Sequence, residues 1–180
     1  LSISELSKQL DKHPVDLVFD IALNDNLETI FNAALLNSDE DVVADFLIHE
    51  ASLISLSDAG AHLRYMCDAG YGLHLLGHWV RNKKIMSLED AIRRLTTLPA
   101  SLFNIKDRGH LLPGKFADLV LFDKDEINLG PLKRFDDLPN GESRMMREPI
   151  GVEGVWVNGQ MVFDGKQYKN IPSPGKILRA

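Results

Sequence analysis

The chain has 180 residues, 44% hydrophobic and 26% charged, with a formal net charge of -6, which describes a globular protein of one ordinary domain or two small ones. The acidic balance excludes a general nucleic-acid binder, which needs a basic face, and no apolar run approaches the ~20 residues of a membrane span. A single cysteine, Cys67, excludes an internal disulfide framework and fits a reducing compartment, so we expect a cytoplasmic protein without nucleic-acid or membrane partners.

Up to about residue 103, helical patterns alternate with short apolar runs. Helical spacing, with Pro14 suited to a first turn and Ser38 and Ser87 suited to capping, predicts six helices. They cover residues 4–10, 14–22, 38–47, 71–83, 87–95 and 99–103. The apolar runs 29–36 and 53–56 predict strands buried on both faces.

This alternation is typical of β/α units around a parallel sheet. Two strands do not make such a sheet stable, because a parallel pair buries both faces only with more neighbours. We therefore expect the first half, which begins at Leu1 without a Met, to be part of a longer protein.

The pattern changes near Gly109, and the last third favours β-structure. A strand is expected over 117–123. Two β-rich runs flank Asn158-Gly159, the strongest short-range signal for a hairpin. The polar segment 124–149 is expected to form an excursion, and the tail 172–175 to be extended. We place a domain boundary here, between residues 1–108 and 109–180.

Asp58 stands where the apolar run 53–56 gives way to a polar, Gly-containing segment, in SLSDAGAH. In a (β/α) barrel the chemistry lies at the carboxyl ends of the strands, so this position suits a catalytic carboxylate. An Asp that caps the next helix or shapes a turn would produce the same pattern.

Three stretches carry a family resemblance: SLSDAGAH, LLGHWVRNKKIMSLEDAIRRLTTLPASLFNIKDRGHLLPGKFADLVLFD and GVWVNGQMVFDGK. Together they resemble the C-terminal part of the amidohydrolase superfamily, in particular the D-aminoacylase, or N-acyl-D-amino-acid deacylase, group. The resemblance runs from about Leu1 to Arg179. It implies an α/β fold in which residues 1–108 are the last units of a metal-dependent (β/α)8 TIM barrel. Residues 109–180 would be part of a small β-sandwich.

The resemblance also implies a function. Asp58 matches the Asp that ends barrel strand eight, contacts the metal-bound water, acts as general base and returns the proton to the leaving nitrogen. A zinc-bound water has a pKa of about 7, so a nearby carboxylate takes its proton at neutral pH. We expect a zinc-dependent hydrolase of the C–N amide bond in N-acyl-D-amino acids, with Asp58 both catalytic and at the metal.

The remaining zinc ligands are expected upstream. A catalytic zinc normally has three protein ligands, and the chain contains no His-x-His. We therefore expect the 180 residues alone to be inactive. Exposed strand edges would favour association with the missing half or with a second copy, a homo-oligomer.

His62 and Arg64 follow Asp58 in the same loop and are candidate substrate-binding residues. His62 would hydrogen-bond the substrate or orient Asp58, or it lies at the surface. Arg64 would pair with a substrate carboxylate through two hydrogen bonds, or it is a solvated arginine. The loop departs from the family at Tyr65, Met66 and Cys67, which replace a His/Pro/Arg-containing run.

Other polar residues have simpler explanations. His74 and His78 have metal-ligand spacing on a predicted helix, but no Glu lies between them as in a metalloprotease helix, and Gly77 indicates close packing. A nucleophilic role has little support for the cysteine, which has no base at recognisable spacing. Trp79 and Trp156 are most simply core aromatics, and His110 is most simply a loop residue. Glu89 and Asp90 suit the first turn of a helix, where the helix dipole favours acids.

Two other functions stay open at this point. The chain would be a non-catalytic interaction module if the upstream metal ligands were absent. Alternatively, it would serve a cyclic amidase or a deaminase of the same superfamily, because a fold alone does not decide the reaction.

Overall fold

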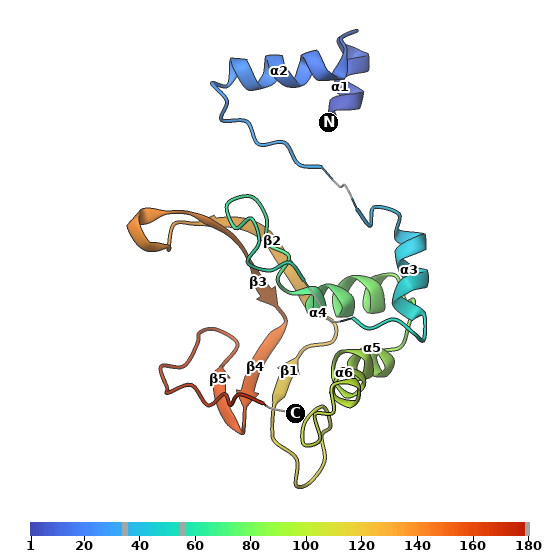
Figure 1. Ribbon diagram of the computed structural model, residues 1–180, viewed down its shortest axis with the longest axis vertical. Helices are drawn as coiled ribbons and strands as arrows, with labels where there is room; N and C mark the ends of the chain where they lie inside the picture. The colour runs from blue at the N-terminus through green and yellow to red at the C-terminus, as the bar shows by residue number, and fades with distance from the viewer. Residues whose placement is uncertain (34–35, 55–56, 179–180) are drawn as a thin grey trace. The chain divides into compact units, whose positions relative to one another are not determined.

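A computed structural model describes residues 1–33, 36–54 and 57–178. The chain divides into two compact units, Leu1–Asp39 and Glu40–Ala180. Figure 1 shows the helices and strands of both units.

The N-terminal unit, residues 1–39, contains helices α1 (Ile3–Gln9) and α2 (Pro14–Asn24). A capping box starts α1, since Glu5 N donates to Ser2 Oγ at 3.2 Å and Ser2 N donates to Glu5 Oε2 at 2.8 Å. Pro14 occupies the first turn of α2, where its missing N–H has no cost. Both helices predicted in this unit are confirmed.

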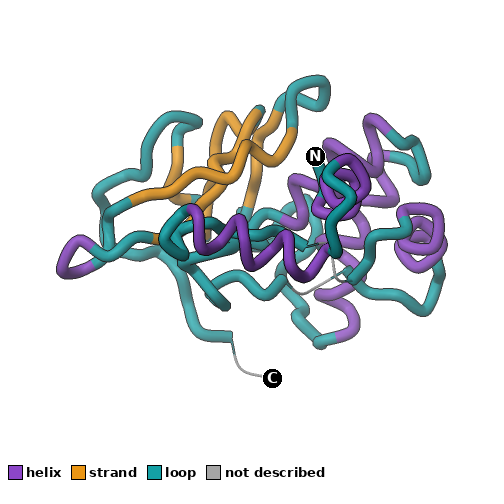
Figure 2. The backbone as a smooth tube through the Cα atoms, turned by 90° about the horizontal axis from the view of Figure 1, so that it is seen from above, coloured by secondary structure: helices purple, strands orange, loops and turns teal. Residues whose placement is uncertain are grey.

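The C-terminal unit, residues 40–180, contains the other predicted helices followed by the strands. Its helical segments are α3 (Glu40–Ile48), α4 (Tyr71–His74), the π-helical η1 (Leu75–Asn82), α5 (Leu88–Leu95), α6 (Thr97–Leu102) and the short 3₁₀ turn η2 (Pro139–Gly141). Its strands are β1 (Leu119–Phe122), β2 (Asn128–Phe135), β3 (Arg144–Ile150), β4 (Val152–Val157) and β5 (Gln160–Phe163). Figure 2 shows the strands gathered in one region of the backbone.

Strands β1, β4 and β5 form an antiparallel sheet in that spatial order, with β4 at its centre. The turn between β4 and β5 consists of Asn158 and Gly159, whose φ angles are 49° and 80°. A type I′ turn needs positive φ at both central residues, and this pair supplies it at low cost. The predicted strand over 117–123 and the predicted hairpin are both confirmed.

Strands β2 and β3 form a second antiparallel sheet within the expected excursion over 124–149, where the sequence analysis predicted no strands. Gly130 and Pro131 interrupt the strand pattern of β2. The register shifts between Leu129 and Leu132, so the irregularity accommodates a proline, which cannot donate to the ladder. A carbon added at Gly130 would lie 2.5 Å from the Glu148 carbonyl oxygen, which explains the glycine.

The strands expected over 29–36 and 53–56 need a correction. The described residues of these runs, 29–33, 36 and 53–54, form no strand, and residues 34–35 and 55–56 lie outside the described part of the chain. A buried parallel strand needs hydrogen-bonding neighbours, and every strand pair among the described residues is antiparallel and lies after residue 118. The barrel therefore stays a prediction.

The core of the C-terminal unit joins its helices to its strands. It consists of Leu75, Leu76, Trp79, Ala91 and Ile127, with partly buried apolar residues packed around them. The core role expected for Trp79 is confirmed. A carbon added at Gly77 would lie 2.6 Å from the Ile127 carbonyl oxygen, so this glycine allows η1 to approach β2 closely, as predicted.

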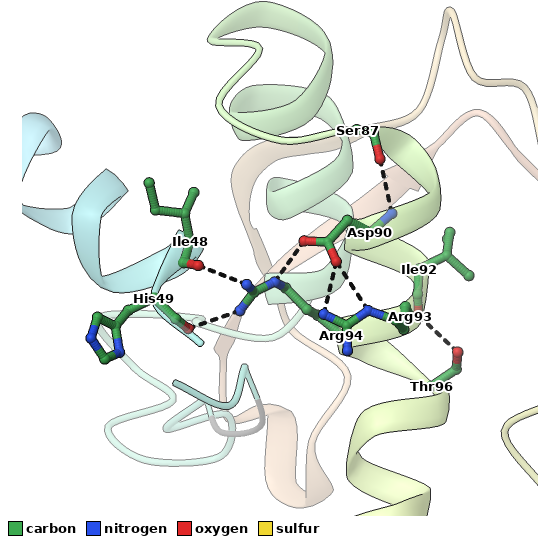
Figure 3. A network of polar contacts seen from close by, with 8 residues as sticks. All are labelled: Ile48, His49, Ser87, Asp90, Ile92, Arg93, Arg94 and Thr96. Atoms are coloured by element: carbon green, nitrogen blue, oxygen red, sulfur yellow. Dashed lines mark hydrogen bonds and ion pairs between the residues drawn. The ribbon is translucent and has the colours of Figure 1, made fainter. Parts of the chain in front are cut away.

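Arg94 connects the end of α3 to α5, as Figure 3 shows. Its side chain is 6% exposed, and its Nε donates to Asp90 Oδ2 at 2.8 Å. Its other nitrogens donate to the carbonyls of Ile48 at 2.7 Å and His49 at 3.1 Å. Carbonyls at a helix C-terminus have no partner within the helix, so this guanidinium fixes the end of α3.

Across the described ranges, every helix is too short or too polar to cross a membrane.

Candidate functional site

Asp58 lies at the surface, at the start of a run of turns that leads to α4. Its backbone carbonyl accepts a hydrogen bond from Ala61 N at 2.8 Å, which closes the first turn. Gly60 has a φ of 98°, and an added side-chain carbon would meet nothing within 4 Å. The glycine thus supplies a left-handed conformation beside an open, solvent-facing carboxylate.

His62 continues these turns with a φ of 51°, and its carbonyl accepts from Tyr65 N at 2.8 Å and from Met66 N at 3.1 Å. Within the described chain, neither the Asp58 carboxylate nor the His62 imidazole has a hydrogen-bond partner. The two side chains are therefore brought into one exposed loop without a hydrogen bond between them. The hypothesis that His62 orients Asp58 has no contact to support it here.

Arg64 is paired across the molecule. Its Nη2 lies 2.7 Å from Glu142 Oε2, and both side chains are largely exposed, at 64% and 58%. Glu142 follows η2 in the connection between β2 and β3. A substrate carboxylate that binds this nitrogen would have to compete with Glu142.

Strands β2 and β3 contact the loop at further points, which sequence analysis missed. Met145 N donates to the Leu63 carbonyl at 2.6 Å, and Arg147 Nε donates to the Cys67 carbonyl at 3.4 Å. Figure 1 shows the loop before α4 beside these strands. No local signal links positions about 80 residues apart, so only the tertiary structure reveals these partners.

His74 and His78 form a second polar cluster, at the junction of α4 and η1. Their rings stack with centroids 4.9 Å apart, and His78 Nε2 lies 2.8 Å from Glu40 Oε1. Glu40 also pairs with Lys83, and hydrogen bonds from Lys83 first and His78 second lower the pKa of Glu40. Partial burial first, and the charge of His78 second, lower the pKa of His74.

The metal hypothesis for His74 and His78 is not supported. Among the residues that the structure describes, no group of three or more His, Cys, Asp or Glu side chains converges as metal ligands would. The same result applies to Asp58, which is exposed and belongs to no such group among the described residues. These residues alone do not fit a zinc site, because zinc needs at least three protein ligands.

An apolar cleft of about 1230 Å³ lies elsewhere, between α5, α6 and the segment that leads to β1. Apolar side chains dominate its lining, for example Leu76, Ile92, Leu95, Phe103 and Phe116. Asp58, His62 and Arg64 are not among its lining residues. Its acidic and basic lining residues are Arg108 and Asp118, which are paired with each other, and Glu89, Arg93 and His110.

The remaining residues singled out in the sequence lie at helix-start, loop and strand positions. Glu89 and Asp90 lie in the first turn of α5, His110 lies in an exposed loop, and Trp156 is half-buried in β4. Cys67 is half-buried and contributes its carbonyl to Arg147.

The chain belongs to the amidohydrolase family, whose model matches residues 15–163. It is similar to an N-acyl-D-glutamate deacylase of Alcaligenes xylosoxydans xylosoxydans, 33% identical over 145 residues, which are 78% of this chain and 27% of that protein. An N-acyl-D-aspartate deacylase of the same organism is 35% identical over 105 residues, 58% of this chain and 19% of that protein.

A solved structure of N-acyl-D-glutamate deacylase from Bordetella bronchiseptica, complexed with zinc and a phosphonate inhibitor, has 37% sequence identity and a TM-score of 0.48. The match covers 60% of this chain and 20% of that structure. The chain thus spans about a quarter or less of the length of these relatives.

Proposed function

We propose that this chain supplies the Asp58-bearing part of an amidohydrolase that cleaves the amide bond of N-acyl-D-amino acids. The observation that carries the proposal is an exposed Asp58 at a glycine turn, whose carboxylate has no hydrogen-bond partner among the described residues, within a family match that spans residues 15–163. The similarity to N-acyl-D-glutamate and N-acyl-D-aspartate deacylases supports the substrate class.

In this proposal Asp58 is the general base. Its carboxylate accepts a proton from the attacking water and returns it to the nitrogen as the C–N bond breaks. A positioned carboxylate contributes about 10²- to 10⁴-fold to such a step. Asp58 is exposed in the described part of the chain, so water and substrate can reach it.

Zinc is the proposed cofactor. Zinc, when bound, lowers the pKa of a coordinated water to about 7. Asp58 would be the contribution of this chain to the metal, and the other ligands would come from outside these 180 residues. We further propose that residues 1–108 belong to the barrel of the intact protein and 109–180 to its β-sandwich.

His62 and Arg64 are the proposed substrate-binding residues. His62 is exposed and its imidazole has no partner within the described residues, so it is free to hydrogen-bond an acyl or carboxylate oxygen. Arg64 would bind the α-carboxylate of the substrate by exchanging Glu142 for it. The single cysteine supports a cytoplasmic location.

The test compares Asp58→Asn with Asp68→Asn in the intact protein, using N-acetyl-D-glutamate and N-acetyl-D-aspartate as substrates. Asp68 is an exposed acid of the same segment and is the matched control. We expect Asp58→Asn to lower kcat about 10²- to 10⁴-fold and Asp68→Asn to leave it unchanged.

Three results would overturn the proposal. Equal activity of the two variants would remove Asp58 from the chemistry. Activity of the wild-type protein on cyclic amides or aminopurines, with none on N-acyl-D-amino acids, would assign a different reaction. A folded wild-type protein that hydrolyses none of these substrates would support the interaction module instead.

A further inference from the structure

The candidate loop is attached to the β2–β3 hairpin, residues 128–150, at several separate points. The first is a backbone hydrogen bond, in which Met145 N donates to the Leu63 carbonyl at 2.6 Å. The partner of Met145 in the sheet is Arg134 on β2, so this bond is additional to the β2–β3 pairing. The loop is thus attached to β3 by main-chain atoms, without dependence on side-chain type.

Arg147 provides a second attachment. Its Nη1 donates to the Gly130 carbonyl of β2 at 3.0 Å, while its Nε faces the Cys67 carbonyl at 3.4 Å. The half-buried guanidinium therefore connects both strands of the hairpin to the loop. A carbon added at Gly70 would lie 2.5 Å from Leu129 Cδ1. The chain entering α4 therefore packs closely on β2.

The third attachment is the ion pair between Arg64 and Glu142, at 2.7 Å. It lies at the η2 end of the hairpin, away from Arg147. An exposed ion pair is weak by itself, but this one acts on a loop that is already fixed on both sides of Arg64, at Leu63 and Cys67. Holding Arg64 here restricts the turns that lead back to Asp58.

Within the described ranges, the hydrogen bond that Asp58 makes is a local one, the turn bond from Ala61 N. The residues Leu63 to Cys67, which are attached to β3, fix one end of the turns that contain Asp58. They therefore help to set the position of the Asp58 carboxylate. A catalytic base must be held within a fraction of an ångström of its productive position, and a misplacement of about 1 Å can cost about 100-fold in rate.

We propose that the β2–β3 hairpin positions the Asp58 loop, with Glu142 and Arg147 as positioning residues for the hydrolysis. This inference rests on the proposed function for its kinetic consequence. Before substrate binds, Arg64 is the loop's half of the ion pair with Glu142. The hairpin, to which the sequence pattern assigns no role, would then support the loop through Glu142 and Arg147.

The experiment compares Glu142→Ala with Glu148→Ala in the intact protein. Glu148 is the matched control, because it forms an equally exposed ion pair with Lys133 on the same hairpin, also at 2.7 Å. We expect Glu142→Ala to lower kcat about 3- to 5-fold, the range that loss of an exposed pair allows. The charge exchange Arg64→Glu with Glu142→Arg should return the hydrogen exchange of residues 58–67 to the wild-type rate, which a general loss of stability would not explain.

A second pair of variants tests the deeper attachment. Arg147→Met removes the bridge between both strands and the loop, and we expect a fall in kcat of about tenfold. Arg134→Met is its control, since the exposed Arg134 donates to Ser143 at 3.4 Å and to no residue of the loop in the described part of the chain. Hydrogen exchange of residues 58–67 should rise in Arg147→Met and Glu142→Ala and stay unchanged in both controls.

The outcomes separate the two proposals. If kcat and loop exchange of Glu142→Ala and Arg147→Met equal those of their controls, the positioning role is wrong. If the charge exchange leaves the hydrogen exchange of residues 58–67 as fast as in Glu142→Ala, the Arg64–Glu142 pair does not anchor the loop and the role of Glu142 is wrong. If Asp58→Asn keeps full activity while the exchange changes occur as expected, the proposed function fails and the mechanical attachment stands.

Discussion

Arg94→Met is the sharpest test of how the chain before Asp58 is held. Methionine keeps the apolar stem and removes only the guanidinium, which is buried at 6% exposure and contacts Asp90 and the carbonyls of Ile48 and His49. Each carbonyl left without a partner costs about 1–3 kcal/mol. Relief of the cost of burying a charge offsets part of this. We expect a net loss of about 2–3 kcal/mol, concentrated at the end of α3.

Native-state hydrogen exchange in α3 measures this loss directly, because it reports local opening. A loss of about 2–3 kcal/mol corresponds to about 30- to 150-fold faster exchange. Arg93→Met is the matched control: Arg93 binds the same Asp90 but is 49% exposed, so its loss should cost less than about 1 kcal/mol. Equal effects of the two variants would refute the assignment of Arg94 as the anchor of α3.

Two further predictions concern packing and pH. Gly77→Ala places a carbon 2.6 Å from the Ile127 carbonyl oxygen and should cost about 1–3 kcal/mol, seen as a lower Tm, whereas Gly175→Ala, with no contact closer than 3.6 Å, should be neutral. The pKa of His74 is lowered below its usual 6.5, so the unfolded chain binds the proton more readily. Stability should therefore be constant above pH 6.5 and fall below it, until the pH reaches the lowered pKa. His74→Asn should reduce the slope of Tm against pH between 7.5 and 5.5, and an unchanged slope would contradict this.

The sequence predicts those elements whose cause is local. Ser87 precedes α5 and accepts a hydrogen bond from Asp90 N at 3.1 Å, as its capping position indicates. Asn158 and Gly159 form the hairpin turn because they adopt positive φ easily. In each case the residues that determine the structure are within a few positions of it, so the pattern contains the information.

The sequence misleads where pairing across the chain overrides a local signal. Gly130 and Pro131 look like breakers, yet β2 forms because β3 supplies a partner and the register shift accommodates the proline. Conversely, the apolar runs 29–36 and 53–56 look like strands, but their described residues have no strand to pair with. Strand formation depends on neighbours that a local pattern does not specify.

The candidate site shows the same division. The turn at Asp58 and Gly60 can be predicted from the local sequence, because a φ of 98° at position 60 favours glycine. The partner of Arg64 cannot be predicted in this way, because Glu142 is 78 residues away, in a segment for which the sequence predicts no strands. A solvated arginine and an anchored arginine have the same local pattern, so only the fold distinguishes them.

Asp58 therefore lies in sequence between two anchors that share no residue. Arg94 fixes the end of α3 at Ile48 and His49, and the β2–β3 hairpin fixes the loop after Asp58. Free-energy effects of distant, independent sites add, so their fold-increases in exchange rate multiply. In the double variant Arg94→Met with Glu142→Ala, the fold-increase in hydrogen exchange should equal the product of the fold-increases in the two single variants. A larger combined effect would mean that the two anchors act through one cooperative unit that includes the Asp58 loop.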